Sequence, residues 1–75
     1  MKELAARLKA MREGKGFTSA QAAKAIECHP NTVLSVERAH SNPTFQYILA
    51  FSKLTGYSLN EIAFGEALVR ADGRA

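Results

Sequence analysis

The chain has 75 residues, of which 47% are hydrophobic, and it carries a formal net charge of +3. This hydrophobic content is ordinary for a globular domain and argues against a disordered chain. Seventy-five residues make one domain, and a domain of this size buries only roughly 60% of the surface that its unfolded chain exposes. Cys28 is the only cysteine, which excludes an intramolecular disulfide.

The same features predict where the protein acts and what it contacts. The single cysteine, together with the lack of a secretory signal or a long apolar run, leads us to expect a cytoplasmic protein that does not enter a membrane. A basic domain is compatible with a polyanionic partner. Its Lys and Arg residues are scattered along the chain, which favours a few positioned phosphate contacts over a continuous basic surface.

The sequence predicts five helices and no strands. The first helix covers about residues 2–13, and Gly14 and Gly16 end it. Its apolar side chains recur at i, i+4 and i+7: Leu4, Leu8 and Met11.

The next two helices are short and closely spaced. The first covers about residues 19–26, and Thr18 with Gln21 forms the capping box that starts it. Its buried stripe is Ala22, Ala23 and Ile26. The second covers about residues 30–38 and begins with Pro30, whose missing N–H would have no helical partner there. Its narrow apolar face is Val33 and Val36.

A loop over residues 39–43 leads to the fourth helix, at about residues 44–54, which stops at Gly56. We expect its inward side chains to be Phe45, Ile48 and either Phe51 or Ser52. Ser58 and Glu61 form a second capping box that starts the last helix.

The last helix should add Leu59, Ile62 and Ala63 to the core. Gly65 either ends or bends this helix, and residues 66–70 would extend it in the second case. We therefore expect one domain over residues 1–70 and a flexible tail over residues 71–75.

The third helix carries small polar side chains away from its apolar face: Asn31, Thr32 and Ser35. Such side chains can hydrogen-bond base edges when a helix lies in the major groove of DNA. An ordinary polar helix face is the alternative interpretation.

From about Leu4 to about Phe64, the chain resembles the helix-turn-helix family of lambdoid phage repressors and Cro proteins (the XRE family). The resemblance is carried by Arg12, GFTSAQAA at 16–23, NTVLSVER at 31–38, Asn42-Pro43, and the turn at 56–59. The chain departs from the family at three positions. Ser19 stands for a Gln that contacts phosphate, Glu27 for the Gly of the turn, and Thr55 for a core Leu.

The resemblance implies a compact five-helix bundle and sequence-specific binding of double-stranded DNA as a transcription regulator, in the first instance a repressor. One module reads too few base pairs for good discrimination, which favours a homodimer on a pseudo-palindromic operator. The alternatives are an antitoxin-type or restriction-modification controller that regulates its own synthesis, and a helical protein–protein adaptor that no longer reads DNA.

The candidate site residues form four groups, and the family resemblance supports the first three. The base-contacting candidates are Pro30, Asn31, Thr32 and Ser35. The DNA-backbone candidates are Lys15, Thr18, Ser19, Arg38, His40, Ser41, Asn42 and Thr44. The resemblance further implies a structural ion pair, Arg12 with Glu37. The predicted dimer interface is Phe64 and Leu68, provided that the last helix continues through Gly65; the alternative places Phe64 in the monomer core.

Cys28 and His29 are adjacent but do not predict a metal site, because a zinc site needs about four ligands and the chain has one Cys and two His. Cys28 is expected to be a partly buried, inert thiol, and His29 to occupy the N-cap of the third helix. The sequence contains no nucleophile–base arrangement, paired carboxylates or phosphate-binding glycine loop. We therefore expect neither an enzyme, nor a cofactor, nor a small-molecule substrate.

Overall fold

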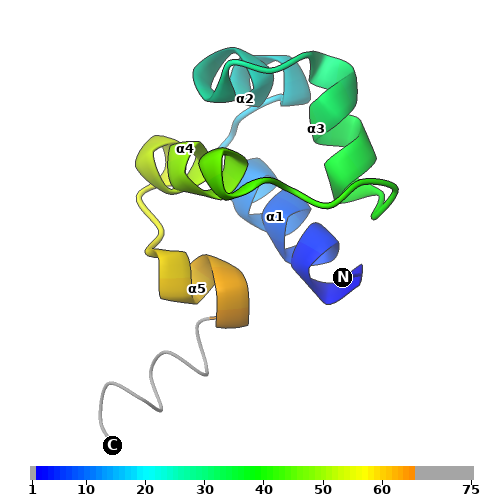
Figure 1. Ribbon diagram of the computed structural model, residues 1–75. Coiled ribbons are helices and arrows are strands. Elements are labelled where there is room, and N and C mark those ends of the chain that lie inside the picture. The colour runs from blue at the N-terminus through cyan, green and yellow to red at the C-terminus, as the bar shows by residue number, and fades with distance from the viewer. Residues whose placement is uncertain (1, 66–75) are drawn as a thin grey trace, which may run out of the picture.

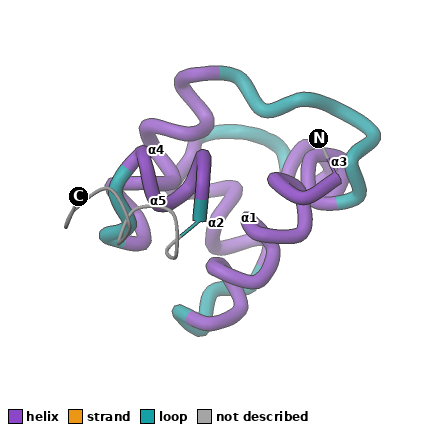
Figure 2. Tube along the Cα trace, turned by 90° about the horizontal axis from the view of Figure 1, so that it is seen from below, coloured by secondary structure: helices purple, strands orange, loops and turns teal. Residues whose placement is uncertain are grey.

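The computed structural model describes residues 2–65, which form five α-helices and no strand (Figure 1). The helices are α1 (Lys2–Gly14), α2 (Ser19–Ile26), α3 (Pro30–Glu37), α4 (Phe45–Thr55) and α5 (Leu59–Phe64). Figure 2 shows short loops between them, with a longer connection between α3 and α4. The predicted all-α, five-helix fold is confirmed. No helix among these residues is both long enough and apolar enough to cross a membrane.

Two capping boxes start helices, as the sequence predicts. At α2 the Thr18 hydroxyl accepts from the Gln21 N–H at 3.1 Å, and the Gln21 side chain accepts from the Thr18 N–H at 2.8 Å. At α5 the same reciprocal pair joins Ser58 and Glu61, at 3.0 and 2.8 Å. Each box satisfies two backbone donors that a helix start otherwise leaves without a partner.

The helix α4 is also defined at both ends by local chemistry. The Thr44 hydroxyl accepts from the Tyr47 N–H at 3.0 Å, which makes Thr44 the N-cap. Gly56 ends the helix with a φ of 86°, a left-handed conformation that glycine adopts without a Cβ penalty.

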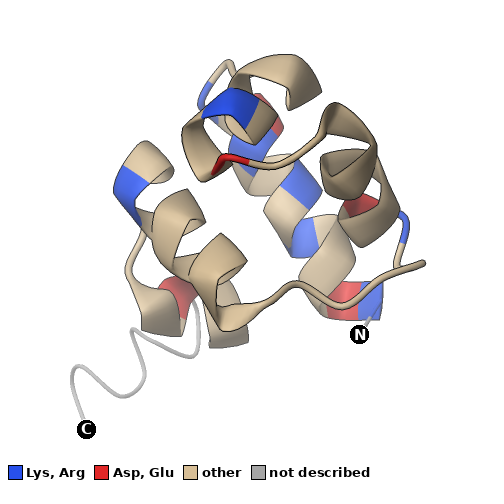
Figure 3. Cartoon of the chain, turned by 45° about the horizontal axis from the view of Figure 1, so that its top comes forward, with Lys and Arg blue, Asp and Glu red and all other residues tan. Residues whose placement is uncertain are grey.

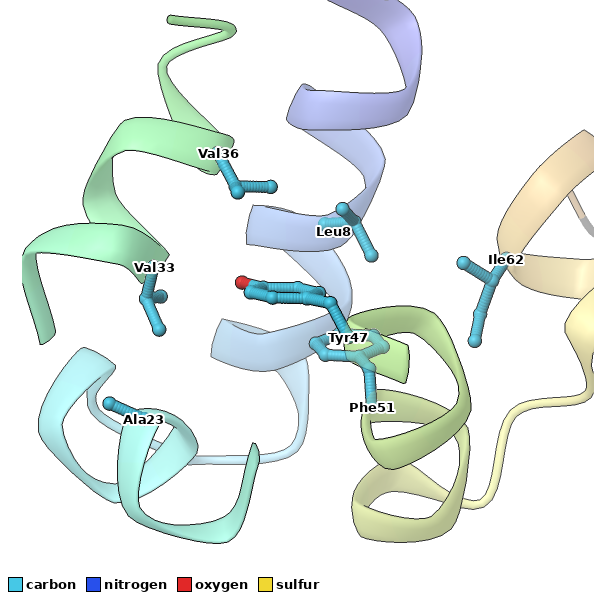
Figure 4. Packing of buried hydrophobic residues seen from close by; sticks show 7 residues of the cluster. All are labelled: Leu8, Ala23, Val33, Val36, Tyr47, Phe51 and Ile62. Carbon is cyan, nitrogen blue, oxygen red and sulfur yellow. The ribbon is translucent and has the colours of Figure 1, made fainter. Parts of the chain in front are cut away.

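Side chains from all five helices meet in one core (Figure 4). Its buried members are Leu8, Ala23, Val33, Val36, Tyr47, Phe51 and Ile62. Tyr47 lies at the centre of the view with its hydroxyl directed toward α3. Because every helix contributes to this core, packing the core also fixes the position of α3.

The expected core was wrong at three apolar positions. Phe45 is 70% exposed and Leu59 is 38% exposed, and Ala63 is also exposed. In α4 the buried stripe runs through Tyr47, Phe51 and Thr55, one face away from Phe45. The helix α5 has only six residues, and Ile62 is the one whose side chain is buried in the core.

Thr55 occupies a buried position although its side chain is polar. It is 7% exposed, and its hydroxyl donates to the Phe51 carbonyl at 2.8 Å. The same oxygen accepts from the Tyr57 N–H at 3.3 Å. A buried hydroxyl with both a donor and an acceptor partner avoids most of the cost of burying a polar group.

The helix α5 ends at Phe64, and Gly65 has non-helical backbone angles, φ 91° and ψ 159°. Arg7 of α1 donates from Nη1 to the carbonyls of Ile62 and Ala63, at 2.9 and 3.0 Å. A continuing helix would offer those carbonyls to the N–H groups of residues 66 and 67. The helix therefore does not continue through Gly65. A face shared by Phe64 and Leu68 would require it to continue. Leu68 and the expected tail lie outside the described residues.

Candidate nucleic-acid interface

The turn between α2 and α3 is closed by backbone hydrogen bonds from two consecutive residues. The Cys28 N–H donates to the Ala23 carbonyl at 2.9 Å, and the Glu27 N–H to the Lys24 carbonyl at 3.3 Å. This is the Schellman pattern, which requires a left-handed residue at Glu27. Glu27 has φ 68° and ψ 47°, so the turn keeps that conformation although glycine is absent.

His29 is the N-cap of α3, as expected from the sequence. Its backbone is extended, and its Nδ1 accepts from the Asn31 N–H at 3.0 Å. Pro30 follows at the first helical position, where it has no N–H to satisfy. The start of α3 is thus fixed by the side chain of one residue and the ring of the next.

The exposed side of α3 carries the polar residues that were predicted to read bases. Pro30, Asn31 and Thr32 are exposed, while Val33 and Val36 on the opposite side are buried. Ser35 is half-buried, and its hydroxyl lies 3.1 Å from the hydroxyl of Ser41 in the following loop. One hydroxyl proton is used in this bond, so the pair keeps a second proton with which to donate to another acceptor.

The loop from Arg38 to Asn42 is attached to the end of α3. The N–H groups of His40 and Ser41 both donate to the Ser35 carbonyl, at 2.9 and 3.3 Å. Ala39 has a φ of 62°, an uncommon conformation for a residue with a Cβ. The predicted DNA-backbone candidates in this loop are exposed: Arg38, His40, Ser41 and Asn42.

Three further candidates lie at the starts of two helices. Thr18 is exposed at the N-cap of α2, with Ser19 half-buried beside it, and Thr44 is exposed at the N-cap of α4. Both threonine hydroxyls accept from backbone N–H groups, which leaves the hydroxyl proton free to donate. The positive end of a helix dipole at each position favours an anion.

Lys15, another predicted phosphate contact, lies close to an aromatic ring. Its Nζ is 5.1 Å from the centre of the Tyr57 ring, within the range of a cation–π interaction. Tyr57 lies in the connection between α4 and α5, which Figure 1 places on the other side of the molecule from α3. In this conformation the Lys15 ammonium is directed away from the exposed residues of α3.

The charge on α3 is low (Figure 3). Glu37 near its end is the one charged residue within the helix, and its carboxylate is bound to Arg12. Lys and Arg are instead distributed over α1, α2 and α4, with Arg38 directly after α3. The exposed face of α3 therefore offers hydrogen-bonding groups rather than charge.

Cys28 is half-buried, and this burial raises the pKa of its thiol. A raised pKa lowers the fraction of reactive thiolate, which agrees with an inert side chain. Within residues 2–65, no three His, Cys, Asp or Glu side chains are grouped so that they could hold a metal ion.

Sequence reasoning missed two contacts that shape this region. The Ser35–Ser41 bond joins a base-reading candidate to a backbone candidate, and the Tyr57 ring redirects Lys15. Both serines are among the site residues that the sequence predicts, but nothing in their spacing shows that the loop folds back on α3. The Tyr57 contact joins residues 42 positions apart in the chain and leaves no local signal.

Comparison with known proteins supports the assignment of these elements. No curated protein and no solved structure matches the chain. Residues 3–64, which include all five helices except the first residue of α1, match the helix-turn-helix domain family. A domain of this kind indicates DNA binding and a role in the regulation of transcription. With its two short, turn-linked helices α2 and α3 in place, the chain belongs to the helix-turn-helix domain family.

Proposed function

We propose that this protein is a sequence-specific, double-stranded-DNA-binding repressor of transcription that binds a pseudo-palindromic operator as a homodimer, with the site organisation of the XRE family. The observation that carries the proposal is the exposed, uncharged first turn of α3 within a helix-turn-helix domain. In this arrangement α3 is the helix that enters the major groove.

Asn31 is the principal base-reading residue in this proposal. It is the second residue of α3 and is exposed, and an Asn side chain can bond the N6 and N7 atoms of adenine together. Pro30 and Thr32 flank it and offer apolar contact to a thymine methyl group. Ser35, one turn further along, contacts the next base through its hydroxyl, with Ser41 as the donor in the bond between the two serines.

The DNA backbone is held mainly by neutral donors at helix starts. Thr18 and Ser19 at the start of α2, and Thr44 at the start of α4, present hydroxyl groups beside the free N–H groups of a first turn. His40, Ser41 and Asn42 add donors from the loop between α3 and α4. Such contacts fix the position of α3 on the duplex without reading sequence.

Charge contributes through fewer residues. Arg38 is exposed at the end of α3 and is placed to neutralise a phosphate beside that helix. Lys15 contributes only if its side chain leaves the Tyr57 ring. We therefore expect the salt dependence of binding to reflect a small number of released counterions.

A homodimer is proposed because one module reads only a few base pairs, which gives too little discrimination against competing sites. Two copies related by a two-fold axis double these contacts and place half-sites about one helical turn apart. Phe64, which is 57% exposed at the end of α5, offers an apolar contact for a second copy. Its exposure argues against the alternative in which Phe64 fills the monomer core.

The test is selection of bound sequences from a random double-stranded DNA pool, followed by titration of the selected duplex and a scrambled duplex at several salt concentrations. We expect enrichment of an inverted repeat, preference over the scrambled duplex, and affinity that falls with salt. Arg38→Ala should flatten the slope of log affinity against log salt by about one, whereas Lys53→Ala, an exposed lysine on α4, should not. No enrichment and no salt dependence would instead indicate an adaptor that does not read DNA.

A further inference from the structure

We propose that His29 is a DNA-contacting residue that donates a hydrogen bond from its Nε2–H to an acceptor atom of DNA beside the base read by Asn31. The acceptor is an oxygen or ring nitrogen: a phosphate oxygen, or N7 of a purine. This inference rests on the proposed function, and it assigns to His29 a role beyond the capping of α3.

The capping bond determines which nitrogen of the His29 ring carries the proton. Nδ1 of His29 accepts from the Asn31 N–H at 3.0 Å, so this nitrogen carries no proton while the cap is formed. In a neutral imidazole the other nitrogen then carries the proton. Capping therefore makes Nε2 a hydrogen-bond donor.

The geometry of the ring determines the direction of the Nε2–H donor. Nδ1 faces the first turn of α3, and the two nitrogens of an imidazole point in widely different directions, so Nε2 points away from the helix. His29 is exposed, and among residues 2–65 no group accepts a hydrogen bond from Nε2. The Nε2–H is thus available to a ligand outside the protein.

Two hydrogen bonds to the first turn of α3 hold His29 in place. The His29 carbonyl accepts from the Thr32 N–H at 2.8 Å while Nδ1 holds the Asn31 N–H. His29 is therefore bonded to the backbones of two residues that are proposed to read bases. The ring is thus held against the first turn of α3, beside the backbone that carries both side chains.

The choice of histidine supports a second task. Ser, Thr, Asp and Asn are the preferred N-cap residues, and this chain uses Thr or Ser at the N-caps of α2, α4 and α5. Of the four N-caps described in residues 2–65, only that of α3, the proposed recognition helix, is a histidine. A serine there would cap α3 but would present no donor on the far side of a ring.

The test separates capping from contact with two substitutions. His29→Ser keeps a cap oxygen and removes the Nε2 donor; the serine hydroxyl lies close to the backbone and does not reach the position of Nε2. His29→Ala removes both the cap and the donor. We expect His29→Ser to match the thermal stability of the wild type and to bind the selected duplex about three- to tenfold more weakly, as the loss of one neutral hydrogen bond predicts. His29→Ala should lose both stability and affinity. A His29→Ser variant that binds like the wild type would overturn the proposal.

The DNA acceptor is identified by modifying the duplex. Neutral methylphosphonate linkages test phosphate oxygens, and 7-deazapurine bases test N7. At the contacted atom, the modification should weaken the wild type but add no further loss to His29→Ser. Failure of every modification to show this pattern would contradict the contact.

The tautomer can be tested without DNA. A long-range ¹H–¹⁵N spectrum of the free protein at neutral pH should show the His29 proton on Nε2. A proton on Nδ1 would overturn the conclusion that Nε2 is the donor. Should the wild type select no sequence at all, the proposed function fails, while the tautomer measurement still stands on its own.

Discussion

Arg12 and Glu37 form a two-pronged, buried ion pair that joins α1 to the last turn of α3. Arg12 Nε lies 2.7 Å from Glu37 Oε2, and Nη2 lies 3.1 Å from Oε1. The third nitrogen of the guanidinium donates to the Phe17 carbonyl at 2.7 Å, which ties the same side chain to the entry of α2. The bond to Glu37 holds the pKa of Arg12 above its ordinary value. One side chain thus fixes the relative placement of α1, α2 and α3.

Glu37→Ala should destabilise the fold by roughly 3–5 kcal/mol, because it leaves the Arg12 charge buried without its partner. The two side chains are only 9% and 3% exposed, so water cannot replace the lost carboxylate. Chemical denaturation of the variant measures the loss. Glu13→Ala is the matched control, since Glu13 lies 3.7 Å from Arg12 but is 58% exposed and should contribute little. Equal stability of the two variants would contradict the structural role of the pair.

Glu27→Gly should raise the free energy of unfolding by about 1 kcal/mol. Glu27 holds a left-handed backbone that costs a residue with a Cβ roughly 1–2 kcal/mol, and the larger entropy of unfolded glycine offsets part of the gain. A domain of this size should then melt about 4–8 °C higher. Glu27→Ala removes the same charge but keeps the Cβ, so it should give no such increase. A lower melting temperature for Glu27→Gly than for Glu27→Ala would show that the turn is not strained.

Tyr47 should make the protein lose stability at alkaline pH. Burial, and to a lesser extent the nearby Glu37 carboxylate, raise the pKa of its hydroxyl above the ordinary value of 10.0. Above about pH 10 the unfolded chain releases this proton and the folded chain keeps it, so stability falls by about 1.4 kcal/mol per pH unit from this group. Below that pH its contribution is fully present.

Tyr47→Phe should therefore reduce the slope of stability against pH between about pH 10 and 11.5, measured by urea denaturation. Identical slopes in Tyr47→Phe and the wild type would place the alkaline sensitivity elsewhere.

Phe64→Asp should convert the proposed homodimer to a monomer while the helical fold is kept. The residue is 57% exposed, so the monomer loses little by the change, whereas an apolar interface would have to bury a carboxylate. Sedimentation velocity and circular dichroism report the two quantities separately. Phe45→Asp provides the same substitution at a residue that is 70% exposed on α4, and it should remain dimeric. A dimeric Phe64→Asp variant would move the interface away from α5.

Local chemistry accounts for the parts of the fold that were predicted correctly. The capping boxes at Thr18 and Ser58, the glycine at position 56 and the proline at position 30 set helix ends through residues that are neighbours in sequence. Each of these signals depends on bonds within about four residues, so it can be read from the chain alone.

The errors arose where distant residues decide the outcome. Phe45 and Tyr47 are both large and apolar enough for a core, and only the way in which α4 packs against α2 and α5 decides that Tyr47 is buried. The end of α5 at Phe64 is one of the two outcomes expected from Gly65, but the bond of Arg7 to the Ile62 carbonyl joins residues 55 positions apart and leaves no local signal. In the interface, the exposure of Asn31 and Thr32 follows from helical spacing, but the contacts of Ser35 and Lys15 depend on how a loop and a turn fold back.

The most direct measurement of the DNA-reading role compares Asn31→Ala with Asn60→Ala on a panel of single-base variants of the selected operator. Both asparagines are exposed second residues of a helix, one on α3 and one on α5, so the two changes should perturb stability alike. We predict that Asn31→Ala weakens binding by about 1–3 kcal/mol and loses its preference at one base position, while Asn60→Ala binds like the wild type. An unchanged affinity and base preference in Asn31→Ala would contradict the proposal that the first turn of α3 reads DNA.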